Sequence, residues 1–167
     1  MKILNILDIF KAKVLKKYSP KNAKMTPINP ATIEDKLFRL NENIKFIDDI
    51  LEKSDKDILS DRPLYYGLQH LLQISIEIII DISSHILAEK FSINPKTYAD
   101  VIVTLGEKNV VDQKFAAEQA EMAKFRNMLV HYYDNIDDKK VIEYGRSASR
   151  IFTLFGKAFS DFLTKNR

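Results

Sequence analysis

The sequence predicts an all-α protein, an up-and-down bundle of about five to six helices. Apolar residues recur along most of the 167-residue chain at alternating spacings of three and four, which is the period of one helix face. No segment alternates apolar and polar residues as a half-buried strand does. Proline interrupts a helix, and every proline falls in a break or at a helix start: Pro20, Pro27, Pro30, Pro63 and Pro95. This length fits one domain with a substantial core.

Residues 1–18 are expected to form a basic amphipathic helix or extension, and residues 19–29 a proline-containing linker. The apolar face follows a 4-3-4 spacing through Ile3, Leu7, Phe10 and Val14. Residues 1–24 carry seven lysines against one aspartate, so the rest of the chain sums to −3. The segment is either a basic arm for RNA or a partner helix, or a dispensable extension that precedes a true start at Met25. The main domain has no general nucleic-acid charge signature.

Residues 30–167 form the predicted bundle, and three long helices dominate it. The first starts with Asn29 as N-cap and Pro30 as first helical residue. The apolar stripe along one face of a helix is called its seam, and the seam of this helix is Ile33, Leu37, Leu40, Ile44, Ile47 and Leu51. The second runs from Pro63 to about Phe91 and is apolar nearly all round, which predicts the central helix. The last follows a break at residues 135–138, with the seam Tyr144, Ala148, Ile151, Phe155, Ala158 and Phe162.

Two further helices are expected between the second and the last. Asn94-Pro95 starts a short helix that Gly106 ends, and a longer helix runs from about Asp112 without a break into residues 126–133. The absence of cysteine excludes a disulfide framework, thiol catalysis and cysteine-ligated zinc. The apolar stretch 73–82 is too short to span a bilayer and no signal-peptide pattern is present, so we expect a cytoplasmic protein without membrane contact.

The chemistry-bearing stretch is residues 126–133, which read R-N-x-L-V-H-x-Y. RNA is cleaved without a metal when its 2′-hydroxyl attacks the adjacent phosphate. A base must then take the hydroxyl proton, and cations must stabilise charge on the phosphorane oxygens. The imidazole of His131 suits the first task and the forked guanidinium of Arg126 the second. These residues are the predicted catalytic pair, and Asn127 is a supporting residue.

Helix geometry complicates this pair. At about 100° per residue, Arg126 and Tyr133 lie within about 20° of each other, but Arg126 and His131 lie about 140° apart. Either the helix unwinds near His131, or two copies of the chain meet and each supplies part of the site. We favour a homodimer that forms around this helix. The competing interpretation is structural: Arg126 pairs with a core carboxylate, and His131 and Tyr133 merely finish a helix.

The central helix carries Glu77, Asp81 and His85 at intervals of four. One helix that supplies such a row is weak evidence for a metal, so we expect neither a metal nor another cofactor. A polar stripe is the more ordinary interpretation. An intermediate hypothesis gives Glu77 or Asp81 a supporting role in which one of them pairs with Arg126 and orients it.

The stretch resembles the R-x-x-x-x-H-x-Y motif of HEPN-domain ribonucleases, and most closely that of HepT-like toxins in MntA–HepT toxin–antitoxin modules. The segments 65–69, 81–86 and 95–100 are also similar to that family. The resemblance covers roughly residues 30–165. It implies a HEPN-type helical dimer acting as a metal-independent endoribonuclease on RNA, with Arg126 and His131 catalytic. It also implies that an MntA-like nucleotidyltransferase antitoxin AMPylates Tyr133 in a type VII-like module.

Two alternatives remain open at this stage. One is a non-catalytic HEPN nucleotide-binding or adaptor domain, in which Arg126 holds a phosphate without cleaving anything. The other is a plain helical interaction module, in which the apolar seams explain the whole pattern. RNA cleavage by the purified protein separates the first hypothesis from both.

Overall fold

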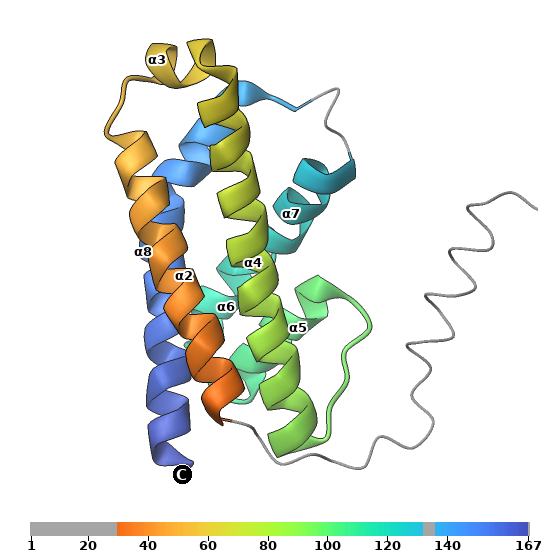
Figure 1. Ribbon diagram of the computed structural model, residues 1–167. Helices are drawn as coiled ribbons and strands as arrows, with labels where there is room; N and C mark the ends of the chain where they lie inside the picture. The colour runs from red at the N-terminus through yellow and green to blue at the C-terminus, as the bar shows by residue number, and fades with distance from the viewer. Residues whose placement is uncertain (1–29, 132–135, 167) are drawn as a thin grey trace, which may run out of the picture.

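Three long helices lie side by side and form the body of the protein (Figure 1). The computed structural model describes residues 30–131 and 136–166. The long helices are α2 (Pro30–Leu51), α4 (Arg62–Phe91) and α8 (Asp138–Lys165). A short helix, α3 (Asp55–Ser60), joins the first two. The predicted helix of residues 1–18 and the linker 19–29 lie outside the described residues.

Three shorter helices pack on the other side of α4 from α2 (Figure 1). They are α5 (Tyr98–Glu107), α6 (Gln113–Gln119) and α7 (Met122–His131). α7 contacts α4 and α5, and α6 contacts α5. The described ranges contain helices and no strand, so the all-α prediction is confirmed.

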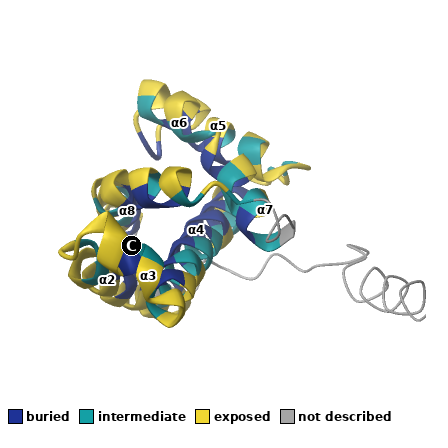
Figure 2. Cartoon of the chain, turned by 90° about the horizontal axis from the view of Figure 1, so that it is seen from above, coloured by how far each residue is buried: buried dark blue, intermediate teal, exposed yellow. Residues whose placement is uncertain are grey.

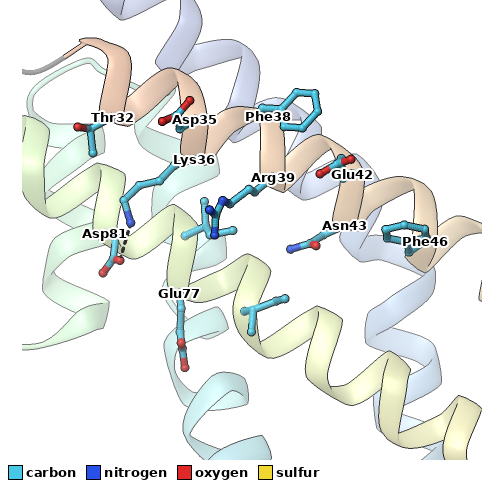
Figure 3. A pocket seen from close by; sticks show the side chains of 12 residues that line it. Thr32, Asp35, Lys36, Phe38, Arg39, Glu42, Asn43, Phe46, Glu77 and Asp81 are labelled. Carbon is cyan, nitrogen blue, oxygen red and sulfur yellow. Dashed lines mark hydrogen bonds and ion pairs between the residues drawn. The ribbon is translucent and has the colours of Figure 1, made fainter.

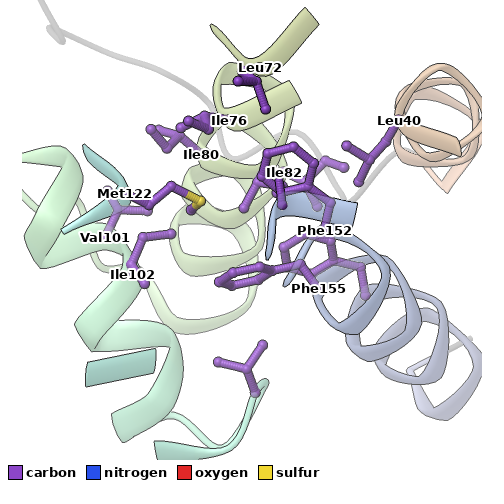
Figure 4. Close-up of a cluster of buried hydrophobic side chains, with 14 of the residues drawn as sticks. Leu40, Leu72, Ile76, Ile80, Ile82, Val101, Ile102, Met122, Phe152 and Phe155 are labelled. Carbon is purple, nitrogen blue, oxygen red and sulfur yellow. The ribbon is translucent and has the colours of Figure 1, made fainter. Parts of the chain in front are cut away.

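The core lies where α2, α4 and α8 meet, and buried faces turn inward on all three (Figure 2). Figure 4 shows Leu40 of α2 and Ile82 of α4 beside Phe152 and Phe155 of α8. On α2 the predicted seam is the buried face, with Ile44 and Leu51 only partly buried. On α8 the buried face is wider than the predicted seam, because Phe152 and Phe159 are also fully buried. The reason is that α8 packs against both α2 and α4, and two neighbours cover more than one stripe.

α4 is the central helix, as its composition predicts. It begins one residue before the expected Pro63, because Asp61 is the N-cap and its side chain accepts a hydrogen bond from the Leu64 amide at 3.1 Å. Its last residue is Phe91, and the C-cap residue Ser92 follows with a φ of 55°, the left-handed conformation typical of a helix C-terminus. By length and composition alone α4 could cross a membrane, but half of its most apolar window is buried inside the bundle. That burial is what a core helix shows.

The predicted helix from Asp112 into residue 131 is wrong in one respect, because it is divided. α6 ends at Gln119 and α7 begins at Met122. α6 packs on α5, whereas α7 packs on α4, and one straight helix cannot lie against both. The break at residues 120–121 changes the chain direction between the two packing surfaces.

The limits of α5 also differ from those predicted. Thr97 is the N-cap in place of Asn94, and its hydroxyl accepts a hydrogen bond from the Asp100 amide at 3.1 Å. Gly106 lies inside the helix, which continues to Glu107. A Cβ at Gly106 would stand 2.7 Å from the Cβ of Ala116. This glycine therefore lets α5 and α6 approach closely and does not end the helix.

Candidate functional site

Arg126 of α7 and Glu77 of α4 form an ion pair between the two helices. Arg126 donates to Glu77 Oε1 from Nη2 at 2.7 Å and from Nε at 3.0 Å. The side chains are 17% and 36% exposed, respectively. Charge-assisted hydrogen bonds from two donors of one guanidinium hold the group in a defined orientation. Of the two carboxylates expected to orient Arg126, Glu77 is the one that contacts it.

Residues from three helices surround the Arg126 guanidinium. Its Nη1 donates to Asn127 Oδ1 at 3.3 Å, and the ring of Tyr98 lies with its centroid 5.4 Å from Arg126 Cζ. Gln73 Nε2 donates to the same Glu77 Oε1 at 3.0 Å. Glu77 Oε1 therefore accepts three hydrogen bonds, and these fix the position of the Glu77 carboxylate as well as that of Arg126. The cation–π contact adds a further attraction from α5.

Apolar packing on either side of Arg126 places α7 against α4. Met122 and Leu129 are buried, 1% and 8% exposed, and lie on the face of α7 that turns toward α4. Phe125, next to the arginine, stacks on Tyr144 of α8 with ring centroids 3.9 Å apart. Arg126 thus stands at the border between the buried face and the exposed face of its helix. This position explains why its charge is partly shielded and still reachable.

Asp81 and His85 do not join Arg126. Asp81 forms an ion pair with Lys36 of α2, whose Nζ lies 3.0 Å from Asp81 Oδ2. Asp81 and Glu77 are one turn of α4 apart and therefore bind different cations. The Nε2 of His85 is buried and has no hydrogen-bond partner among residues 30–131 and 136–166. Within the residues that the structure describes, no cluster of three acidic, histidine or cysteine side chains could hold a metal ion.

His131 is the last residue of α7, and the structure describes its backbone. The helix is continuous from Met122 to this residue, so positions 126 and 131 remain about 140° apart around the axis. Tyr133 lies outside the described residues. The structure therefore places the arginine and its supporting residues, and leaves the histidine and tyrosine side chains as predictions.

A groove of about 1000 Å³ runs between α2 and α4 (Figure 3). Glu77 and Asp81 stand on its α4 wall, and Lys36 and Arg39 reach in from α2. Four carboxylates and two cations line it (Asp35, Glu42, Glu77, Asp81, Lys36 and Arg39). A phosphate-rich strand would meet net negative charge there, so the groove is unsuited to RNA.

Two residues of the Arg126 cluster escaped the sequence reasoning. No motif in the sequence marks Tyr98, yet the residue is 43% exposed and its ring lies against the guanidinium. Gln73 was included only in the apolar centre of α4, although it stands one turn before Glu77. The four-residue spacing of Gln73 and Glu77 was the only signal available, and it becomes meaningful once Glu77 is known to bind the arginine.

The chain is similar to known proteins over most of its length. A family model described as Ribonuclease HepT-like matches residues 40–153, more than half of the chain. The chain belongs to the HepT-like family. It is also 28% identical over 148 residues to a protein named tRNA nuclease HepT from Aphanizomenon flos-aquae, a match that covers 83% of this chain and 95% of that protein.

Solved structures show that this HepT-like chain has the HEPN toxin fold. The tri-AMPylated HEPN toxin of Shewanella oneidensis, solved in complex with an MNT antitoxin, matches with a TM-score of 0.72 and 22% identity. The match covers 80% of this chain and 99% of that one. YutE of Bacillus subtilis, described as a cytosolic protein of unknown function, matches with a TM-score of 0.73 and 19% identity over 83% of this chain and 92% of its own.

Proposed function

We propose that this HepT-like protein is a metal-independent endoribonuclease, the toxin of a type VII-like toxin–antitoxin module that acts in the cytoplasm. The supporting observation is the Arg126 guanidinium, which is 17% exposed and held by Glu77, in a chain of the HepT-like family. A relative named as a tRNA nuclease and a shared fold with a HEPN toxin support the same assignment. RNA is the proposed substrate.

The reaction is attack of a ribose 2′-hydroxyl on the neighbouring phosphorus. His131 takes the hydroxyl proton, the new P–O bond forms, and the bond to the 5′-oxygen of the next nucleotide breaks. The leaving oxygen gains a proton, which gives a 2′,3′-cyclic phosphate and a 5′-hydroxyl. Arg126 stabilises the negative charge on the equatorial phosphorane oxygens through the Nη hydrogens that Glu77 does not occupy. No change of oxidation state and no co-substrate are needed.

A homodimer can direct an arginine and a histidine at the same phosphate, which a single copy of α7 cannot do. Because positions 126 and 131 point about 140° apart, the Arg126 of one protomer and the His131 of its partner form each site. We place the second copy on the face that α2, α4 and α7 share. Phe38 and Phe46 of α2 are 64% and 55% exposed there and border the groove with the partly buried Ile74 and Ile78. Exposed apolar side chains that cluster in this way mark protein–protein interfaces.

The proposed partner is an MntA-like nucleotidyltransferase. It transfers AMP from ATP to the phenolic oxygen of Tyr133 and releases pyrophosphate. An adenylate at this position puts a phosphate beside Arg126, occupies the place of the substrate phosphate and neutralises the arginine. Tyr133 occupies the tyrosine position of the R-x-x-x-x-H-x-Y motif and Tyr132 does not, so Tyr132 is the less suitable acceptor. Intact mass of the co-expressed protein should rise by whole AMP units, and Tyr133→Phe should remove the gain.

The deciding experiment is cleavage of RNA by the purified, unmodified protein. Arg126→Ala and His131→Ala should each reduce kcat at least about 100-fold, because a general base alone contributes that much. Arg150→Ala, an exposed arginine of α8, is the matched control and should cut at the parental rate. The oligomeric state of every variant should match the parent. Parental cleavage by His131→Ala would contradict the mechanism.

One observation favours the non-catalytic alternative, a HEPN nucleotide-binding or adaptor domain. Glu77 occupies two donors of Arg126 and offsets part of its charge, which leaves an arginine able to hold a phosphate but weakens stabilisation of the more highly charged phosphorane. That domain would bind AMP or RNA in a manner dependent on Arg126 and would leave the RNA intact at every protein concentration. The same cleavage experiment, read together with binding, separates the two functions.

A further inference from the structure

A second cavity, of about 510 Å³, lies beside Arg126 on the side of α4 away from the α2–α4 groove. Its walls are the start of α5 and one face of α7, which lie next to each other (Figure 1). We call it the Tyr98 cavity. It is lined by Lys96, Thr97, Tyr98, Ala99, Ala123, Lys124 and Asn127. Its volume falls in the range of cavities that hold small organic ligands.

Two of its lining residues also touch Arg126. Tyr98 holds its ring against the guanidinium, and Asn127 accepts a hydrogen bond from Nη1. A ligand in the Tyr98 cavity is therefore one side chain away from the arginine that faces the scissile phosphate in the proposed function. Tyr98 is 43% exposed, so part of its ring is free to stack on a planar group.

The charge of the Tyr98 cavity is opposite to that of the α2–α4 groove. Among the residues that the structure describes, Lys96 and Lys124 are its charged lining residues, and no carboxylate lines it. Lys124 pairs with the exposed Glu121 at 2.6 Å, whereas Lys96 makes no ion pair within the described part of the chain. An aromatic ring beside a lysine that is free to contact phosphate is the combination that binds single-stranded nucleic acid, by base stacking and phosphate contact.

We propose that the Tyr98 cavity binds a nucleotide of single-stranded RNA that flanks the linkage cut at Arg126. The base stacks on Tyr98, Lys96 contacts a backbone phosphate, and Asn127 offers an amide to the base edge or the ribose. This assignment rests on the proposed endoribonuclease function. It adds that the enzyme recognises an unpaired nucleotide next to the scissile bond, because a base within a duplex cannot stack on a protein ring.

The test uses a 2′-O-methyl RNA oligonucleotide with one free 2′-hydroxyl, so that only one linkage can be cut. A matched set carries a single abasic residue on either side of that linkage. For Tyr98→Ala we expect KM to rise about tenfold with kcat within about twofold, and Tyr98→Phe should behave as the parent. An abasic residue on one side should raise the parental KM by a similar factor and should not raise that of Tyr98→Ala further.

Salt dependence tests the lysine. Lys96→Ala should lower the slope of log KM against log salt by about one, the effect of one lost phosphate contact. Lys157→Ala, an exposed lysine of α8, should leave the slope unchanged.

Three results would overturn the proposal. In the first, the abasic residue raises the KM of Tyr98→Ala by the same factor as it raises the parental KM. The missing base and the Tyr98 ring would then act independently and would not contact each other. The second is a loss confined to kcat, which means that Tyr98 only positions Arg126. The third is slower AMPylation by the antitoxin with an unchanged KM for RNA, which assigns the cavity to the transferred adenylate. If the parent cuts no RNA, the proposed function fails, and fluorescence anisotropy with the same oligonucleotides then decides the binding site by itself.

Discussion

The structure limits where the positive charge of Arg126 points. Glu77 holds the Nε–Nη2 edge, Asn127 holds Nη1, and Tyr98 covers one face of the guanidinium. The remaining Nη hydrogens are the ones left for a substrate oxygen. Glu77 therefore has two opposing effects: it orients the arginine, and it offsets part of its charge.

For catalysis, the orientation that Glu77 gives to Arg126 should matter more than the charge of Arg126 that Glu77 offsets. A misplacement of about 1 Å in a reacting group costs up to about 100-fold in rate, and Glu77→Gln keeps the carbonyl oxygen but loses the ionic contact that fixes Arg126. We expect Glu77→Gln to lower kcat about tenfold with little change in KM. Stability should change by less than about 1 kcal/mol, because the pair is partly exposed.

The control for this prediction is Asp55→Asn, which removes a second inter-helix ion pair, the one with Arg146 at the far end of α2. It should not alter kcat. A kcat that rises in Glu77→Gln would show that the carboxylate restrains the arginine and does not position it. Steady-state kinetics on the single-hydroxyl oligonucleotide measures both variants.

Part of this site was predictable from sequence. The pairing of Arg126 with a carboxylate of the central helix follows from the helix assignment, since a partly buried arginine needs a partner. The choice of Glu77 over Asp81 depends on the rotation of α4 between α2 and α7, and no local pattern contains that angle. Tyr98 joins the cluster because α5 packs on α4 and α6 and so lies next to α7. This arrangement depends on tertiary packing, which no local sequence pattern shows.

At the scale of elements, the long helices and α5 were predictable, but α3 and the division between α6 and α7 were not. α2 has 22 residues, and the spacing of its apolar residues repeats often enough to define a face. α3 has six residues and one buried side chain, Ile58, so it carries no period. The break between α6 and α7 has neither proline nor glycine. It arises because α6 and α7 pack on different helices, and a sequence pattern does not show this.

Gly106 gives the clearest stability prediction at this scale. Gly106→Ala gains helix propensity of about 1 kcal/mol but forces a methyl to within 2.7 Å of the Ala116 Cβ and 3.0 Å of the Gln113 backbone. Overpacking of this kind costs about 1–3 kcal/mol, and small, rigid neighbours give way least. We expect a net loss of about 1–2 kcal/mol in the free energy of unfolding.

Gly67→Ala is the matched control, because nothing lies within 4 Å of a Cβ at this position of α4. It should stabilise the protein by about 0.5–1 kcal/mol through helix propensity alone. Urea unfolding of both variants measures the difference. Equal stabilisation by the two substitutions would show that α5 and α6 separate readily, and that their close contact is not needed for the fold.

At the scale of the whole molecule, charge and shape divide the surface into faces of different use. The α2–α4 groove is acidic and bordered by exposed phenylalanines, which suits a second copy of the chain. The Tyr98 cavity, on the other side of α4, is lined by lysines and suits RNA. Arg126 reaches Glu77 on α4 and Tyr98 on α5, so it lies between the two faces. A site assembled from two protomers and entered by single-stranded RNA is consistent with this arrangement.

Mixing two inactive variants tests the shared site directly. Arg126→Ala retains His131, and His131→Ala retains Arg126. In a heterodimer of the two, one composite site has both residues and the other has neither. Equal amounts, exchanged by mild denaturation and refolding or by co-expression, should therefore recover about a quarter of the parental rate, because half of the dimers are mixed and each has one intact site.

The double variant Arg126→Ala/His131→Ala, mixed with either single variant, is the control and should recover nothing. Activity that stays absent in a mixture proven by mass spectrometry to contain heterodimers would place both groups of each site in one protomer. The helix would then have to unwind near His131 and bring the histidine round to the arginine within a single chain. Recovery near one quarter instead requires that the guanidinium and the imidazole reach the same phosphate from opposite sides of a dimer interface.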